Sequence, residues 1–172
     1  MAKVQANGIT IEVEEMGSPA DPPILLIMGL NAQLTVWPEG FCRGLADRGH
    51  HVVRFDNRDV GLSTWLDDQP PGDPIEALFT VLGGGTIEAP YSLADMADDA
   101  VGVIDALSLG SAHIVGASLG GMIGQHVVTR HPDRVRTFTS IMSMPRFIPM
   151  EMEVAFSLQP PDVAPHDREA IV

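Results

Sequence analysis

The sequence predicts an α/β fold, with a mostly parallel β-sheet and an antiparallel hairpin at its N-terminus. Three observations support this prediction. Strand-like runs alternate with helix-like runs, one strand-like run is apolar throughout, and an Asn-Gly pair separates the first two runs. The chain has 172 residues, 45% of them hydrophobic and 19% charged, which is typical of one globular domain with a buried core.

The first elements are a hairpin and a buried strand. Asn7-Gly8, a strong signal for a two-residue turn, separates strand-like residues 2–5 from residues 9–15. Residues 22–29 (PPILLIMG) are bounded by prolines and a glycine and are otherwise continuously apolar, which is typical of a strand buried on both faces of a parallel sheet. In such a sheet, reactive residues gather at the carboxyl ends of the strands.

Helices and strands then alternate along the chain. The expected elements are a helix at about 36–48, a strand at 51–56, a helix at 92–107, a strand at 112–117, a helix at 119–130 and a strand at 135–143. Ser92 can cap the helix at 92–107, and Asp95 and Asp98 lie near its N-terminus, where the helix dipole favours anions.

Charge and cysteine content exclude several classes of function. The net charge of −13 disfavours binding to nucleic acid or to an anionic membrane surface. Cys42 is the only cysteine, so the sequence offers neither an internal disulfide nor a cysteine cluster for a metal. No apolar run approaches the length that spans a membrane, and residues 1–10 lack a signal-peptide core. We expect a soluble, cytoplasmic protein that needs no metal and no cofactor.

One short motif carries chemistry. Gly116-Ala117-Ser118-Leu119-Gly120 matches G-x-S-x-G and lies between an expected strand and an expected helix, which is the context of a nucleophile elbow. The glycines leave room for a sharp turn at Ser118, and the backbone N–H of Leu119 can stabilise a developing oxyanion. The alternative is a glycine-rich turn that only packs tightly or that binds a phosphate.

A second oxyanion donor is expected in the loop after the buried strand, in the segment IMGLNAQ (27–33). Gly29 allows a close approach of the backbone, and the backbone N–H of Leu30 would be the donor. The alternative is an ordinary turn between a strand and a helix.

In these segments the chain resembles the α/β-hydrolase family. The matching segments run in the family's order over residues 4–143: the hairpin, ILLIMGLNAQLTVWP, VVRFDNRDVGLST, YSLADMADDAVGVIDAL, HIVGASLGGMIGQHV and HPDRVRTFTSIMS. The segments MGLNAQ and FDNRDVGLS are most similar in sequence to the esterase branch that includes polyketide methyl-ester esterases such as aclacinomycin methylesterase. The resemblance implies Ser118 as nucleophile and the Leu30 and Leu119 amides as oxyanion hole.

The resemblance also implies a supporting loop beside the site. Its members would be Asp56, Asn57, Arg58 and Gly61. For Asp56 and Arg58, a buried network within the turn is favoured over direct catalysis. Both Trp37 and Trp65 are candidates for the pocket lining or, equally, for the core.

The acid and the histidine of a catalytic triad are missing from their expected places. In the family order, both follow the serine. His126 lies about 12 Å along the expected helix from Ser118, at 1.5 Å per residue, and His131 lies further still. His166, with Asp162 or Asp167 as its partner, is a weak remaining candidate.

The missing groups indicate the N-terminal part of a hydrolase. Residues 1–143 would be the N-terminal part of the core, and residues 144–172 the start of a lid segment or a disordered tail. The strand at 135–142 would then be an exposed sheet edge, which favours self-association of the isolated chain.

The function predicted from these observations is ester hydrolysis by acyl transfer to water through Ser118, with a small-molecule ester as substrate. Two alternatives stay open. One is a non-catalytic, hydrolase-like protein that binds a small molecule or a partner, and the other is a haloperoxidase-like or perhydrolase-like relative. The acyl and alcohol groups of the substrate are not specified by the sequence.

Overall fold

The computed structural model describes residues 1–66 and 89–145. The strands are β1 (Ala2–Ala6), β2 (Ile9–Met16), β3 (Pro23–Ile27), β4 (His51–Phe55), β5 (Ala112–Ala117) and β6 (Val135–Ile141). The helices are α1 (Glu39–Ala46), α3 (Leu93–Ala106) and α4 (Leu119–Arg130), with short 3₁₀ turns η1 (Leu34–Val36) and η2 (Pro132–Arg134).

The strands form a six-stranded sheet in the order β1-β2-β4-β3-β5-β6. The strands from β4 to β6 pair in parallel, while β2 pairs antiparallel with both β1 and β4. The turn between β1 and β2 has positive φ angles at Asn7 (48°) and Gly8 (80°), as two-residue hairpin turns require. The predicted fold class, a mostly parallel sheet with an N-terminal antiparallel hairpin, is confirmed.

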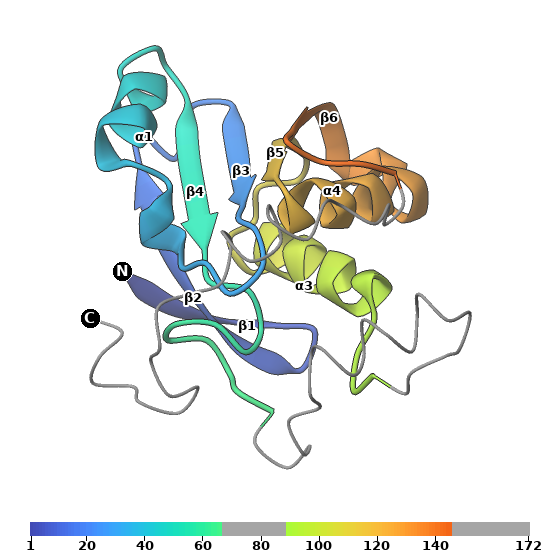
Figure 1. Cartoon of the computed structure of the whole chain (residues 1–172). Helices are drawn as coiled ribbons and strands as arrows, with labels where there is room; N and C mark the ends of the chain where they lie inside the picture. Colours follow the sequence, from blue (N-terminus) through green and yellow to red (C-terminus); the bar gives the residue numbers. More distant parts are fainter. Residues whose placement is uncertain (67–88, 146–172) are drawn as a thin grey trace, which may run out of the picture.

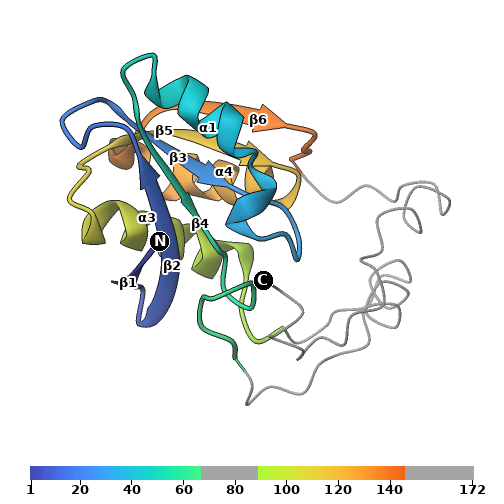
Figure 2. The ribbon, with the colours of Figure 1, turned by 90° about the vertical axis from the view of Figure 1, so that its left-hand side faces the viewer.

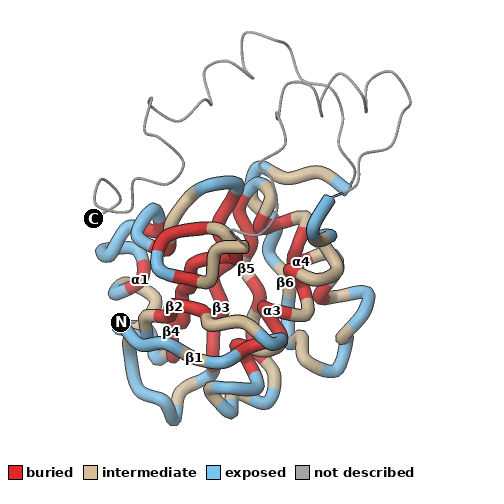
Figure 3. Tube along the Cα trace, turned by 90° about the horizontal axis from the view of Figure 1, so that it is seen from below, coloured by how far each residue is buried: buried red, intermediate tan, exposed pale blue. Residues whose placement is uncertain are grey.

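Helices cover both faces of the sheet, with α1 on one face and α3 and α4 on the other (Figures 1 and 2). Alternate residues of β3 divide between these layers. Leu25 and Ile27 belong to the core that includes α3 and α4, whereas Ile24 and Leu26 pack with Cys42 of α1. A strand buried on both faces is therefore apolar at every position, as residues 22–29 suggested. Figure 3 shows these buried central strands inside a rim of exposed loops.

Two elements differ from their expected bounds for local reasons. The helix expected at about 36–48 is interrupted by Pro38, which caps α1 and holds Trp37 in an extended conformation (φ −68°, ψ 110°). The strand expected to reach residue 143 ends at Ile141, because Met142 has a φ angle of 49°.

Two further features confirm sequence expectations, one about the start of α3 and one about the position of β6 in the sheet. Ser92 and Asp95 form a capping box at the start of α3, so the N-terminal signal of this helix was correctly identified. Within the described part of the chain β6 has β5 as its only strand neighbour, so it is an edge strand.

Candidate active site

The loops that follow β3, β4 and β5 meet at one edge of the sheet. These three strands are parallel neighbours, so their carboxyl ends lie side by side. The loop after β3 contains Gly29 and Leu30, the loop after β4 begins at Asp56, and β5 leads directly into Ser118. The sheet thereby brings the sequence-predicted candidates together.

Ser118 is held in a sharp turn between β5 and α4. Its backbone angles, φ 53° and ψ −120°, lie in a region that residues with a side chain rarely occupy. Its N–H donates to the carbonyl of Ile141 over 2.8 Å, and its own carbonyl accepts from the N–H of Gly121 over 2.9 Å. The side chain is exposed. The turn therefore presents the hydroxyl to solvent on a backbone fixed from both sides.

Three glycines permit this turn by letting α4 approach the sheet. A Cβ added at Gly116 would lie 2.2 Å from the carbonyl oxygen of Gly120. A Cβ at Gly120 would lie 2.1 Å from the carbonyl oxygen of Ile27, and one at Gly121 would lie 2.5 Å from Cβ of Ser143. No side chain fits at these positions without moving the helix away from β3, β5 or β6.

The loop after β3 passes directly over the serine. A Cβ at Gly29 would lie 3.1 Å from Cβ of Ser118 and 3.6 Å from its Oγ. The N–H of Ala32 donates to the carbonyl of Gly29 over 3.4 Å, so residues 29–32 form a turn, with Asn31 at a φ of 53°. In the described residues no backbone carbonyl accepts from the N–H of Leu30 or Leu119. Within the described residues, these two N–H groups are therefore not used by the backbone.

Asp56 joins the two neighbouring loops. Asp56 is buried, with 3% of the residue exposed. Its carboxylate accepts from the N–H of Leu34 over 2.7 Å and from that of Leu62 over 2.9 Å. Burial raises the pKa of Asp56, and the two backbone hydrogen bonds oppose that shift. No hydrogen bond joins Asp56 to Ser118 within the described residues, and the contacts place Asp56 in a buried loop network. Next to it, Nδ2 of Asn57 donates to the carbonyl of Met28 over 3.0 Å.

Arg58 lies in a second buried network. Its Nε and Nη2 donate to Asp99 of α3 over 2.6 and 2.7 Å, and its guanidinium lies 4.9 Å from the centre of the Tyr91 ring. Burial and a hydrogen bond with Asp59 raise the pKa of Tyr91 to about 12. The sequence interpretation did not name Asp99. Its position three residues after Met96 and four before Val103, on the apolar stripe of α3, was a usable signal.

The tryptophans differ in position. Trp37 is 6% exposed and belongs to the core on the α1 side, with Ala117. Trp65 is half-buried, and its Nε1 donates to the carbonyl of Gly61 over 3.1 Å. Trp37 is therefore a core residue.

None of the described histidines forms a hydrogen bond with Ser118. Three of them bond instead to other side chains: His51 to Glu15 (2.8 Å), His113 to Thr137 (2.8 Å) and His131 to Asp98 (2.7 Å). His126 lies within α4, beyond the turn that follows Ser118. The described residues include only the first two of the predicted segment 144–172. They therefore do not include His166, Asp162 or Asp167.

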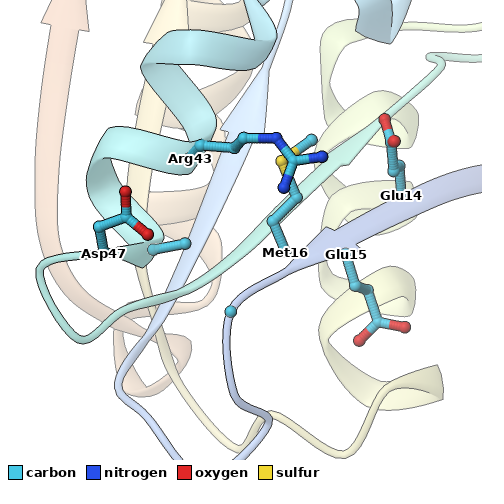
Figure 4. Close-up of a pocket in the computed structure, with 7 residues that line it drawn as sticks. Glu14, Glu15, Met16, Arg43 and Asp47 are labelled. Atoms are coloured by element: carbon cyan, nitrogen blue, oxygen red, sulfur yellow. The ribbon is translucent and has the colours of Figure 1, made fainter.

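A surface hollow lies at the opposite edge of the sheet. It has a volume of about 300 Å³ and is lined by residues of β2 and α1 and by the turn after β2. Figure 4 shows Arg43 reaching from α1 toward Met16 of β2. Met16 pairs with Val52, near the amino end of β4, so this hollow is remote from Ser118. Over residues 1–66 and 89–145, no group of three or more acidic, histidine or cysteine side chains could hold a metal ion. No helix in the same ranges is long and apolar enough to cross a membrane.

Comparisons with known proteins identify the family of this fold. A family model described as alpha/beta hydrolase fold matches residues 22–170. Rhodomycin D methylesterase DauP of Streptomyces sp. strain C5 is 37% identical over 139 residues, covering 81% of this chain and 41% of that protein. Putative carbamate hydrolase RutD of Caulobacter vibrioides (strain NA1000 / CB15N) is 53% identical over 112 residues, covering 65% of this chain and 34% of that protein.

A solved structure has a similar fold. The crystal structure of a hydrolase from Pseudomonas aeruginosa PA01 has a TM-score of 0.67 at 25% sequence identity, covering 86% of this chain and 48% of that chain. The chain spans about 40% of the length of several curated relatives that it matches.

Proposed function

The chain belongs to the α/β-hydrolase fold family, and we propose that it acts as a serine ester hydrolase whose nucleophile is Ser118. The single observation that carries this proposal is the backbone of Ser118, which holds an exposed hydroxyl at φ 53° and ψ −120° between β5 and α4. Strain of this kind costs on the order of 1–3 kcal/mol, and a serine that only packs a turn does not need it.

The proposed mechanism is acyl transfer. Oγ of Ser118 attacks the carbonyl carbon of an ester, and the hydroxyl proton passes to a base. The carbonyl oxygen becomes an oxyanion that accepts hydrogen bonds from the N–H groups of Leu30 and Leu119. The alcohol leaves with a proton from the same base, and water then hydrolyses the acyl–serine ester.

The base of this mechanism lies beyond the described contacts of Ser118. Each described histidine with a side-chain partner is bonded away from the serine, so we propose that the base and its acidic partner come from outside residues 1–66 and 89–145, or from a second chain. Ser118 is exposed, which leaves room for that approach.

We propose a small-molecule methyl ester as the substrate. Two rhodomycin D methylesterases, from Streptomyces sp. strain C5 and Streptomyces peucetius, are 37% and 36% identical over 81% and 78% of this chain, and putative carbamate hydrolases match up to 78% of it. An ester and a carbamate present the same carbonyl chemistry to Ser118, so both substrates should be assayed.

The test is covalent labelling of the 172-residue chain with a fluorophosphonate probe, measured by intact mass. We expect one adduct that disappears in Ser118→Ala. It should persist in Ser111→Ala, where a serine is lost at the opposite end of β5. A folded wild-type chain that takes up no adduct and hydrolyses no methyl ester contradicts the proposal.

A second candidate function is binding of a small molecule without catalysis. It is favoured by one observation, the lack of a described histidine bonded to Ser118. Under this alternative, Ser118→Ala would leave ligand affinity unchanged and no adduct would form on the wild type.

We also propose self-association through β6. This edge strand exposes Arg136, Thr137 and Thr139 and has no strand partner on its outer side among the described residues. Unpaired backbone groups along such an edge favour pairing with another chain.

A further inference from the structure

We propose that Asn57 is a positioning residue that aims the N–H of Leu30 at the reacting carbonyl, acting through the carbonyl of Met28. The inference rests on the proposed function, because Leu30 is one of the two proposed oxyanion donors. Asn57 is 3% exposed, and its Nδ2 donates to the carbonyl of Met28 over 3.0 Å. A buried amide with this one directed contact fixes the orientation of the peptide that follows Met28.

The carbonyl of Met28 is held from a second side by α4. A Cβ added at Gly120 would lie 2.8 Å from this oxygen, so the first turn of α4 closes directly over it. The peptide between Met28 and Gly29 is thereby enclosed between the helix that starts after Ser118 and the loop after β4.

Only Gly29 separates this fixed peptide from the N–H of Leu30. Glycine has the widest range of backbone angles, so by itself it does not define the direction of the next N–H. Its carbonyl accepts from the N–H of Ala32 over 3.4 Å, which leaves Leu30 at the second position of a turn, with its N–H unused inside the turn. Asn57 therefore fixes Gly29 from the N-terminal side, and the turn fixes it from the C-terminal side.

Asp56 holds the far end of the same loop. Its Oδ1 accepts from the N–H of Leu34 over 2.7 Å, four residues beyond Leu30. Two consecutive residues at the end of β4 thus secure both ends of the loop after β3. Asn57 acts next to the proposed oxyanion donor, and the chemistry requires an amide, since a carboxylate at this place could not donate to the carbonyl of Met28.

A suitable control lies in the same loop as Asn57. Oγ of Ser63 donates to the carbonyl of Asp56 over 2.6 Å and accepts from the N–H of Glu12 over 3.0 Å. Ser63→Ala therefore removes buried hydrogen bonds that tie this loop to β2, without touching the loop after β3. A role of Asn57 in stability alone predicts the same result for both substitutions.

The first experiment measures ¹⁵N backbone order parameters of Gly29 and Leu30 in the 172-residue chain. We expect values near 0.85, as in rigid backbone, in the wild type and in Ser63→Ala, and values below about 0.6 in Asn57→Ala. Asn57→Asp, which keeps the side-chain volume and loses the donor, should resemble Asn57→Ala. A mobile Leu30 amide in the wild type overturns the proposal without any variant. Rigid Leu30 amides in both Asn57 variants, with unchanged chemical shifts, also overturn it.

The second experiment connects the loop to the chemistry. The rate of fluorophosphonate labelling at Ser118 should fall about tenfold or more in Asn57→Ala and stay within about twofold of wild type in Ser63→Ala. Equal rates in wild type and Asn57→Ala would exclude a positioning role. An unlabelled wild type would count against the proposed nucleophile and leave the order parameters as the test of positioning.

Discussion

Replacing Gly120 with alanine tests how closely α4 must approach β3. The added Cβ would lie 2.1 Å from the carbonyl oxygen of Ile27 and 2.8 Å from that of Met28, while ordinary contacts begin at 3.4 Å. Helix and strand would have to separate by roughly 1 Å, and forced repacking of a close-packed core costs about 1–3 kcal/mol. The greater helix propensity of alanine returns at most about 1 kcal/mol.

We expect Gly120→Ala to lower the free energy of unfolding by about 2 kcal/mol, because the clash involves backbone atoms that cannot rotate away. For a chain of this size the midpoint of thermal unfolding would fall by about 4–8 °C. Urea denaturation followed by circular dichroism measures the change directly.

Gly40→Ala is the matched control. Gly40 is also the second residue of its helix, and a Cβ added there would meet nothing within 4 Å. This substitution should stabilise the protein by about 0.5–1 kcal/mol through helix propensity alone. If both variants unfold at the same urea concentration, the proposed close approach of α4 to β3 is wrong.

Three other predictions concern the buried ion pair, the cap of α3 and the edge of the sheet. Asp99→Ala should lower the free energy of unfolding, measured by urea denaturation, by about 3–5 kcal/mol, because it leaves Arg58 buried without its partner. Removal of the exposed Asp105 carboxylate should lower it by under about 1 kcal/mol. Equal losses would contradict this account. The pKa of Asp95 is lowered from 3.8 by capping hydrogen bonds, so its stabilising effect is full above pH 3.8 and is lost as the pH falls through the lower, folded-state value. The stability difference between wild type and Asp95→Ala should accordingly shrink over that range, and a difference that stays constant with pH would show that the charge is not involved. Thr139→Pro should reduce the self-associated fraction in sedimentation equilibrium, and a wild-type chain that is already monomeric would refute the role of β6.

The amino-acid sequence determined the elements and their order, because the signals for them are local. The Asn-Gly pair specifies the hairpin turn, and Ser92 with Asp95 specifies the start of α3. The motif around Ser118 depends on neighbours within two residues on each side, so the turn between β5 and α4 was also predictable.

The tertiary structure decided which of these elements meet and what secures them. Strand order placed β3 between β4 and β5, and this order brings the Leu30 loop over Ser118. Asn57 and Met28, which are in contact, are separated by 29 positions in the chain. The contact between Arg58 and Asp99 spans 41 positions. Local propensity contains no information on such pairs, because they form only when the sheet assembles and buried polar groups must find partners. The sequence therefore identified the candidate nucleophile, and the fold selected the residues that hold the loop facing it.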